Sequence, residues 1–275
     1  MKTKSYMARI MAAPHILWAI LFIAAPMLFV LYYSFTDASG AFSTENLRLL
    51  LDAKYLTIFL RSMAFALVAT VICLLVAYPL AYAISRATPR AQKVYMMLIM
   101  LPMWMNFLIR TYSIMAILED NGFLNTILNS LGIPSVHIIN TSAAVIFGMI
   151  YNYLPYMVLP IYTVLSRLDV RLLEASADLG CTPAQTFTRV VMPLSRSGVV
   201  SGVTMVFVPS VSTFYISQKL GGAKYDLIGD SIERQFQSAY NYNLGAAMSL
   251  VLMVIILISM AIMNRYSDGE GGLVA

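Results

Sequence analysis

The chain has few charged side chains and very few residues that bind metals or form disulfides. Only 11% of its 275 residues are charged, and it contains two cysteines and two histidines. Soluble globular domains carry about 25% charged residues. Because 60% of the residues are hydrophobic, the composition excludes an ordinary soluble domain and indicates a membrane protein.

The scarce reactive residues stand apart from one another. Cys73 lies in an apolar run and Cys181 in a polar segment, so the sequence predicts neither a disulfide nor a cysteine-based metal site. His15 and His137 are isolated, and the sequence has no phosphate-binding Gly-Lys-Ser loop and no Ser-His-Asp or paired-carboxylate pattern. We therefore expect a chain that is not an enzyme and that holds no metal or cofactor of its own.

Long apolar segments dominate the rest of the sequence. A helix of about 20 apolar residues crosses about 30 Å of hydrocarbon. The apolar segments predict an all-α, polytopic membrane protein with six transmembrane helices and a single domain over residues 1–275. The expected spans cover residues 14–36, 62–85, 94–118, 142–165, 197–208 with a break at 209–213, and 244–264.

Two of the connecting segments are expected to contain short helices outside the membrane. Residues 37–61 predict an external loop with helices near 47–51 and 55–60, and residues 119–141 predict another with a helix near 124–131. The break predicted at residues 209–213 lies at membrane depth and not in an external loop. Broken backbone at membrane depth is tolerated only where it is buried in protein or lines a cavity.

The distribution of basic residues predicts the orientation in the membrane. Of the 18 Lys and Arg residues, 11 lie on the side that holds both termini and the segment 166–196, whereas 6 lie in the opposite loops. Basic loops stay in the cytoplasm, so both termini and the segment 166–196 are expected there. This bias explains the net charge of +5 without a nucleic-acid partner. The opposite loops hold 8 acidic residues, which is compatible with a cationic substrate.

The cytoplasmic segment predicts two short helices with a corner between them. Leu172, Ala175 and Leu179 recur at helical spacing, and Gly180 follows where a left-handed residue ends a helix. Charged residues of this helix stand where neighbours three or four positions apart can pair; they are Arg171, Glu174 and Asp178.

The second of these helices has a complete start signal. Thr182 offers a hydroxyl cap, Pro183 suits the first helical position, and Gln185 stands where it completes a capping box. Phe187, Val190 and Val191 form the apolar side of this helix, and it is expected to stop at Pro193.

These residues also carry a resemblance to a known family. Glu174-Ala175-Ser176, then Gly180, then nine residues and Val190-Val191-Met192-Pro193 follow the pattern E-A-A, three residues, G, nine residues, I-x-L-P. The segment resembles the EAA loop of permease subunits of ABC importers, with size-similar changes at Ser176, Val190 and Met192. In that family the loop faces the cytoplasm and docks onto the ATP-hydrolysing subunit. The residues that the resemblance assigns to this coupling are Glu174, Ala175, Ser176, Asp178, Leu179, Gly180 and Pro193.

A second resemblance narrows the family. Residues 101–112 read LPMWMNFLIRTY and are similar to the L-P-x-W-x-N-x-L-I-R-x-Y run of the B-type permease of spermidine/putrescine importers. Residues 209–229 resemble the matching fifth-span break and external loop, although neighbouring permeases often have glycine at Ser212. The resemblance implies a type I importer architecture in a bacterial plasma membrane, forming half of a polyamine pathway.

The same resemblance implies the partners. They are a second permease subunit, two ATPase subunits, an external solute-binding protein and membrane lipid, with ATP and Mg²⁺ bound on the ATPase and not on this chain. Because the EAA loop does not report the substrate, a permease for ferric iron, thiosulfate or an oxyanion stays open as an alternative. A membrane-integral enzyme or receptor is the alternative from another class.

A polyamine sets its own chemical requirements. Its ammonium groups need oxygen atoms, and its length favours contact with aromatic faces. The candidates for the substrate path are Trp104, Asn106, Tyr151, Asn152, Tyr156 and Tyr215, together with Tyr153. For any one tyrosine, packing or a place in the interfacial belt is the alternative.

Arg110 does not suit a path for a polycation. An arginine inside a span costs about 2.5–3.5 kcal/mol by insertion scales. We expect it to form a structural pair near the outer end of the third span, with a carboxylate of the partner permease as one candidate.

Overall fold

The computed structural model describes residues 14–222 and 224–267. These residues form helices, and they contain one isolated β-bridge, between Thr36 and Phe42, but no strand. The all-α prediction is therefore confirmed. The chain divides into two compact units, one made of the described residues up to Thr57 with Ser231–Ile255, and the other of Ile58–Asp230 with the described residues from Ile256 onward.

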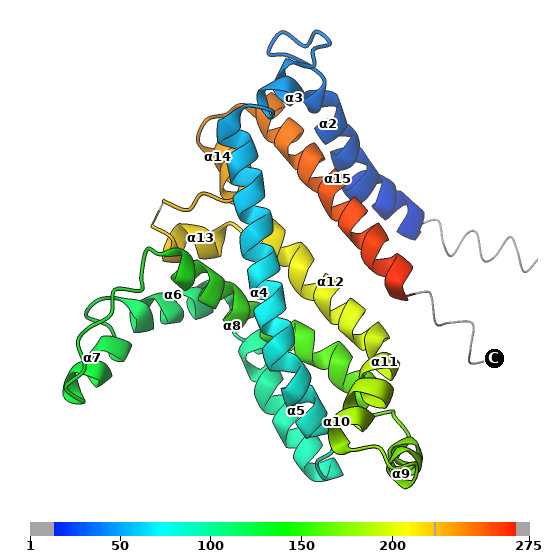
Figure 1. The fold of residues 1–275 in the computed structure, drawn as a ribbon. Helices are drawn as coiled ribbons and strands as arrows, with labels where there is room; N and C mark the ends of the chain where they lie inside the picture. Colours follow the sequence, from blue (N-terminus) through cyan, green and yellow to red (C-terminus); the bar gives the residue numbers. More distant parts are fainter. Residues whose placement is uncertain (1–13, 223, 268–275) are drawn as a thin grey trace, which may run out of the picture. The chain divides into compact units, whose positions relative to one another are not determined.

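Figure 1 labels the α-helices in chain order. The helices are η1 (Ile20–Ala24), α2 (Ala25–Ser34), α3 (Glu45–Leu49), α4 (Ala53–Ser85), α5 (Pro89–Trp104), α6 (Phe107–Leu118), α7 (Phe123–Ser130), α8 (Ser142–Leu165), α9 (Val170–Asp178), α10 (Pro183–Thr186), η2 (Phe187–Val191), α11 (Met192–Leu194), α12 (Arg196–Ser212), α13 (Tyr215–Leu220), α14 (Ile228–Gln237) and α15 (Tyr242–Ser267). The elements η1 and η2 are single widened π-helical turns within longer helices.

The described helices supply four membrane spans by length and composition, and up to six when each bent pair counts as one span. Among the described residues, four helices are long and apolar enough to cross a membrane: Pro14–Ser34, Ala53–Ser85, Ser142–Leu165 and Tyr242–Met263. Two bent pairs raise the number to six: Pro89–Trp104 with Phe107–Ser130, bent by 96°, and Pro183–Leu194 with Arg196–Ser212, bent by 65°. The count of six agrees with the sequence prediction.

The external loop expected at residues 37–61 is shorter than predicted. Helix α4 begins at Ala53, so the short helix expected at 55–60 is the first part of this long helix. No proline or glycine interrupts residues 53–62, and the amide of Leu56 already donates to the Asp52 carbonyl at 3.0 Å. The charges of Lys54 and Arg61 therefore lie on the helix. The helix expected at 124–131 is confirmed as α7.

The third span is broken, although the sequence predicted one continuous segment over 94–118. Helix α5 ends at Trp104 and α6 begins at Phe107, with extended backbone at Met105. Asn106 causes the restart, because its side-chain oxygen accepts the amides of Leu108 at 2.8 Å and Ile109 at 3.4 Å. A capping asparagine is a strong helix-start signal.

The fifth span breaks later than the sequence predicted. Helix α12 continues through Pro209 to Ser212 and ends at Thr213, whose backbone is extended. Proline has a helical φ and lacks only the N–H donor, so it is tolerated inside a helix. Ser210 and Ser212 then satisfy carbonyls of the preceding turn, at 2.7 Å to Val206 and 3.2 Å to Val208. The expected break at 209–213 is therefore reduced to Thr213 and the residue after it.

Helices α8 and α12 form the centre of the larger unit and lie side by side in Figure 1. A Cβ at Gly198 would lie 2.9 Å from the Pro160 carbonyl oxygen, and one at Gly202 would lie 2.7 Å from the Met157 sulfur. Small residues allow helices to approach closely in membranes. The two glycines therefore set the spacing between α8 and α12.

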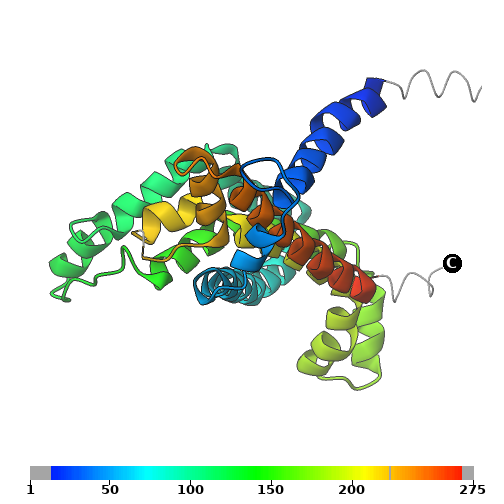
Figure 2. The same cartoon turned by 90° about the horizontal axis from the view of Figure 1, so that it is seen from above.

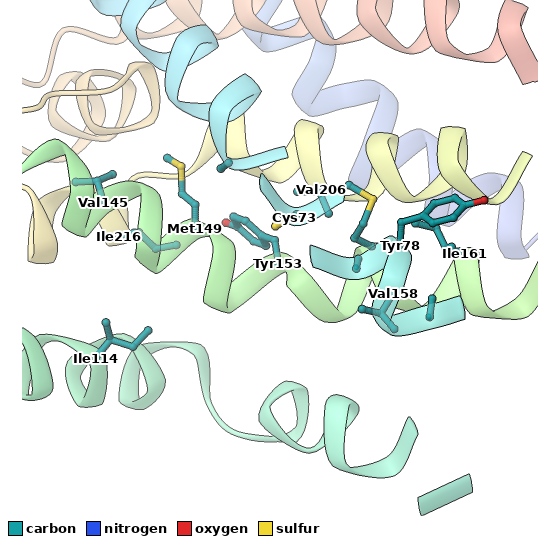
Figure 3. Packing of buried hydrophobic residues seen from close by; sticks show 14 of the residues in the cluster. Cys73, Tyr78, Ile114, Val145, Met149, Tyr153, Val158, Ile161, Val206 and Ile216 are labelled. Carbon is teal, nitrogen blue, oxygen red and sulfur yellow. The ribbon is translucent and has the colours of Figure 1, made fainter. Parts of the chain in front are cut away.

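Helix α4 also presents small residues to this core. Ala69, Cys73, Ala77 and Ala81 recur every four residues and are fully buried. The Cys73 thiol points at the Ile150 carbonyl, 3.8 Å away. Figure 3 shows Cys73 among larger side chains of α8, including Met149 and Val158.

In the smaller unit, one asparagine joins the first and last membrane helices. The side-chain amide of Asn243 donates to the Thr36 carbonyl at 2.7 Å and to the Tyr33 carbonyl at 3.2 Å. The rings of Tyr33 and Tyr242 lie 6.5 Å apart. The end of α2 is thereby fixed to the start of α15.

Candidate functional site

The corner of the cytoplasmic segment is closed by a Schellman motif. Helix α9 ends at Asp178, and Gly180 follows with φ +81°. The amide of Gly180 donates to the Ala177 carbonyl at 2.9 Å, and that of Cys181 donates to the Ser176 carbonyl at 3.0 Å. These two bonds define the motif, so the helix end predicted at Gly180 is confirmed.

The second helix begins as predicted. The Thr182 hydroxyl accepts the Gln185 amide at 3.3 Å, and the Gln185 side chain accepts the Thr182 amide at 2.9 Å. This capping box and Pro183 at the first position start α10. The helix then runs through η2 and α11 to Leu194. The stop predicted at Pro193 is therefore wrong by one residue, because proline is compatible with helical φ. Figure 2 shows this α9–α11 segment, coloured lime green, projecting at one end of the larger unit.

A hydroxyl pair joins the two helices across the corner. The side-chain oxygens of Ser176 and Thr186 are 2.8 Å apart, and the Ser176 hydroxyl also lies 2.8 Å from the Leu173 carbonyl. Ser176 is 6% exposed. The serine that stands in place of the second alanine of the pattern therefore forms a hydrogen bond that an alanine lacks.

The second helix is anchored on α4, which the sequence did not reveal. The Phe187 ring packs edge-on against Tyr78 at 5.5 Å and against Tyr82 at 5.6 Å. The hydroxyls of Tyr78 and Ser195 are 2.6 Å apart. The apolar side of the second helix predicted that this side packs against another element. Sequence spacing does not identify that element as α4. Movement of the segment is thereby linked to α4.

The outer surface of α9 is free to meet another protein. Glu174, Ala175 and Asp178 are exposed, and Leu179 is 84% exposed. The pairing expected between Arg171 and these acids is not formed. Among the described residues, no salt bridge joins Arg171 to Glu174 or Asp178, whereas the His137 ring nitrogen lies 2.7 Å from an Asp120 carboxylate oxygen. His137 is therefore a satisfied histidine of the external loop. Surface pairs on a helix gain only about 0.3–0.5 kcal/mol, so both acids can serve an external contact.

The candidate path residues separate into exposed and buried groups. Trp104 is 76% exposed, Tyr151 40% and Tyr156 38%. Asn106 is exposed, but its side-chain oxygen caps α6. Asn152 is fully buried, and its amide donates to the Gly148 carbonyl at 2.8 Å.

Two of the tyrosines near the helix α8–α12 contact are also close together. The rings of Tyr153 and Tyr156 lie 6.4 Å apart. The Tyr153 hydroxyl donates to the Pro209 carbonyl at 3.4 Å, and Figure 3 shows this ring inside the core. Tyr153 therefore has a packing role within the chain, while Tyr156 keeps a partly exposed face.

Tyr215 belongs to an aromatic cluster at the two helix breaks. Its ring lies 6.0 Å from Tyr112, at 83°, and 6.1 Å from Phe107. The Lys219 ammonium lies 5.3 Å from the Tyr112 ring centre and 5.6 Å from the Tyr215 ring centre. Tyr112 and Lys219 were not among the candidates predicted from the sequence, although Lys219 follows Tyr215 by one helical turn.

Arg110 has a partner inside the same chain. Its guanidinium donates to the Pro102 carbonyl at 2.8 Å and lies 5.8 Å from the Phe107 ring. Arg110 is 5% exposed, and its Nε has no hydrogen-bond partner in the described residues. It borders a mainly apolar cavity of about 550 Å³ between α6, α7 and α8 that Tyr151 also lines. The arginine therefore stabilises the break of the third span.

The comparison with protein families identifies this architecture. A family described as "Binding-protein-dependent transport system inner membrane component" matches residues 74–269. The chain belongs to this family. It is a multi-pass membrane subunit of an ABC importer, which confirms the resemblance predicted from the EAA loop, and it works together with other ABC transporter components. Since members of the family are transport components, the alternative of a membrane-integral enzyme or receptor is excluded.

Individual relatives are similar over most of the chain. The spermidine/putrescine transport system permease protein PotB of Haemophilus influenzae is 39% identical over 246 residues, which cover 86% of each chain. PotB of Escherichia coli K12 is 37% identical over 246 residues, covering 86% of this chain and 90% of that protein. The resemblance to the B-type permeases is therefore confirmed.

A solved structure shows the same fold. A chain of the bacterial alginate ABC transporter, in complex with its alginate pentasaccharide-bound periplasmic protein, has a TM-score of 0.82 and 15% identity, covering 97% of this chain and 95% of that chain. At this identity the likeness concerns the fold alone. It confirms the ABC permease architecture of this family member.

Proposed function

We propose that this chain forms half of the translocation pathway of an ATP-driven polyamine importer, with spermidine and putrescine as substrates. The observation that carries the proposal is the similarity to two PotB proteins at 37% and 39% identity over 86% of the chain. The run from Leu101 to Tyr112 supports it locally, because this run contains both the break of the third span and the exposed Trp104.

The chemistry around the helix breaks suits an extended cation. Aromatic rings supply faces for ammonium and methylene groups, and broken helices expose backbone carbonyls. Trp104, Tyr112 and Phe214 are each at least 43% exposed and lie at or near a break. Of the candidate path residues named from the sequence, the exposed Trp104, Tyr151 and Tyr156 are the first to test, followed by Tyr215. Asn106 caps α6, and Asn152 and Tyr153 are buried within this chain.

The proposed assembly contains a second permease subunit, two ATPase subunits and an external solute-binding protein. Both termini and the α9–α11 segment face the cytoplasm, in accord with the bias of basic residues. ATP and Mg²⁺ bind on the ATPase subunits. The exposed α9 surface, with Glu174 and Leu179, docks onto an ATPase subunit, and the anchoring of Phe187 on α4 passes its movement to the spans. The two states of the pathway are then biased by ligands at distant sites.

Uptake by the reconstituted complex tests the proposed substrate. Proteoliposomes containing this chain, its partner permease, the ATPase and the solute-binding protein would be given labelled spermidine and ATP. We expect uptake that excess putrescine suppresses and that excess sulfate, thiosulfate or ferric iron leaves unchanged. ATP hydrolysis without spermidine uptake, or suppression by one of the other solutes, would reject polyamines and favour the alternative solute.

A further inference from the structure

The Lys219 ammonium is held by aromatic rings. Its nitrogen lies 5.3 Å from the Tyr112 ring centre and 5.6 Å from the Tyr215 ring centre. The Tyr112 and Tyr215 rings themselves lie 6.0 Å apart, nearly perpendicular to each other at 83°. Within residues 14–222 and 224–267, no carboxylate forms an ion pair with Lys219. A lysine in this chain is thus bound by the groups that recognise alkylammonium ligands.

The cluster stands where two broken spans meet. Tyr112 lies on α6, which restarts after Asn106, and Tyr215 is the first residue of α13, which follows the break after α12. The Phe107 and Tyr215 rings, 6.1 Å apart, connect the two restarted helices. Since irregular backbone in a membrane lines a cavity or is buried in protein, and Tyr112 is 44% exposed, a ligand can reach the cluster.

The end of a lysine side chain is chemically the same as the end of a polyamine. Both are a primary ammonium on a chain of methylene groups. The geometry points to a subsite in which Tyr112 and Tyr215 bind a terminal ammonium of the transported polyamine, and which Lys219 fills when no substrate is present. This inference rests on the proposed function. Two ammonium groups repel each other at this separation, so the substrate binds only as Lys219 leaves, and Lys219 acts as an internal competitor.

Removal of the competitor gives a distinctive kinetic result. Lys219→Met keeps an unbranched, flexible side chain and removes its charge, so we expect the KM for spermidine uptake to fall by about threefold to tenfold, in the range of one cation–π contact. Tyr112→Leu in the Lys219→Met background should raise KM again, whereas Tyr112→Phe, which keeps a ring, should raise it less. A lysine with a packing role alone would leave KM unchanged when it is replaced.

A matched lysine outside the aromatic cluster provides the control. Lys224→Met removes an exposed lysine of the following loop and should leave KM unchanged. An unchanged or raised KM in Lys219→Met, or an equal fall in Lys224→Met, would overturn the subsite. Lys219→Gln, measured per assembled complex, gives the same test if the methionine variant assembles poorly. If the wild-type complex imports no polyamine, the proposed function fails and the subsite fails with it. If the wild type imports polyamine but its KM does not respond to Lys219, only the subsite fails.

Discussion

The side-chain oxygens of Ser176 and Thr186 lie 2.8 Å apart and join helix α9 to helix α10 across the corner at Gly180. Together with the Schellman motif and the capping box, this contact makes the corner a rigid unit. Phe187 continues the unit onto Tyr78 and Tyr82 of α4. We therefore expect movement of the exposed surface of α9 to be passed through these contacts to helix α4.

Substitutions at Ser176 separate the hydrogen bond from the packing. Ser176→Ala removes a bond of about 1 kcal/mol but matches the small residue of the family pattern, so we expect uptake within about twofold of wild type. Ser176→Leu adds volume at a position that is 6% exposed, which costs about 1–3 kcal/mol and should release the ATPase. Co-purification of the ATPase and uptake would both be measured. Equal behaviour of the two variants would contradict this account.

Gly180 is required for its backbone conformation, not for space. Its φ is +81°, and a Cβ there would meet nothing within 4 Å. Gly180→Val should cost about 1–2 kcal/mol through the left-handed conformation and weaken ATPase binding, whereas Gly180→Asn, which tolerates this conformation, should retain it. The amount of ATPase that co-purifies with the detergent-solubilised complex decides between them. If asparagine were as harmful as valine, the conformational explanation would be wrong.

Gly198 presents the opposite case, because it is required for space. A Cβ there would lie 2.9 Å from the Pro160 carbonyl oxygen and 3.2 Å from the Ile161 Cα. Gly198→Val should therefore separate α8 from α12 and destabilise the protein by at least about 1–3 kcal/mol. Ser197→Val, at the exposed neighbouring position, is the matched control. Thermal unfolding in detergent should show a lower midpoint for the glycine variant alone.

Arg110 is assigned a structural role at the break of the third span. Arg110→Leu removes a charged hydrogen bond to the Pro102 carbonyl, a loss of about 1.5–3 kcal/mol, and should lower the thermal stability of the complex. Arg110→Lys should recover less than the full loss, because lysine lacks the planar guanidinium fork. Normal assembly of Arg110→Leu with an altered preference among competing solutes would instead place Arg110 in the substrate path.

The two native cysteines offer a test of orientation. Cys181 at the corner is partly exposed, whereas Cys73 is fully buried in α4. A membrane-impermeant maleimide should label inverted vesicles and leave right-side-out vesicles unlabelled, and Cys181→Ser should abolish the signal. Labelling in right-side-out vesicles alone would place the α9–α11 segment outside the cell and reverse the proposed topology.

The sequence predicted best those features that depend on a few adjacent residues. The corner follows from Gly180, Thr182, Pro183 and Gln185, which act through local backbone bonds, and the spans follow from their apolar length. The break at Asn106 was missed because a hydropathy pattern averages over one polar residue, although an asparagine before an apolar run is a cap signal. The prediction of a helix break at Pro209 was wrong, because proline is compatible with helical φ.

The coupling residues could be named from the sequence because they belong to one continuous segment that resembles the EAA loop, and their role in coupling stays a prediction. The grouping of Tyr112, Tyr215 and Lys219 depends on the meeting of α6 with α13, which are about a hundred residues apart in the sequence. Asn152 was selected for its polarity, yet it is fully buried in this chain. No local pattern distinguishes a polar residue that lines a path from one inside the core.

The most direct test of the central claim measures ATP hydrolysis and spermidine uptake in the same proteoliposomes, for wild type and for Glu174→Lys. Glu174 is exposed on α9, so reversing its charge should leave the protein folded and in the membrane. We expect spermidine uptake to fall by at least about tenfold, the effect of 1.4 kcal/mol, with the ATPase either detached or hydrolysing ATP without transport. Uptake at the wild-type rate, with the ATPase still bound, would contradict coupling through the α9–α11 segment.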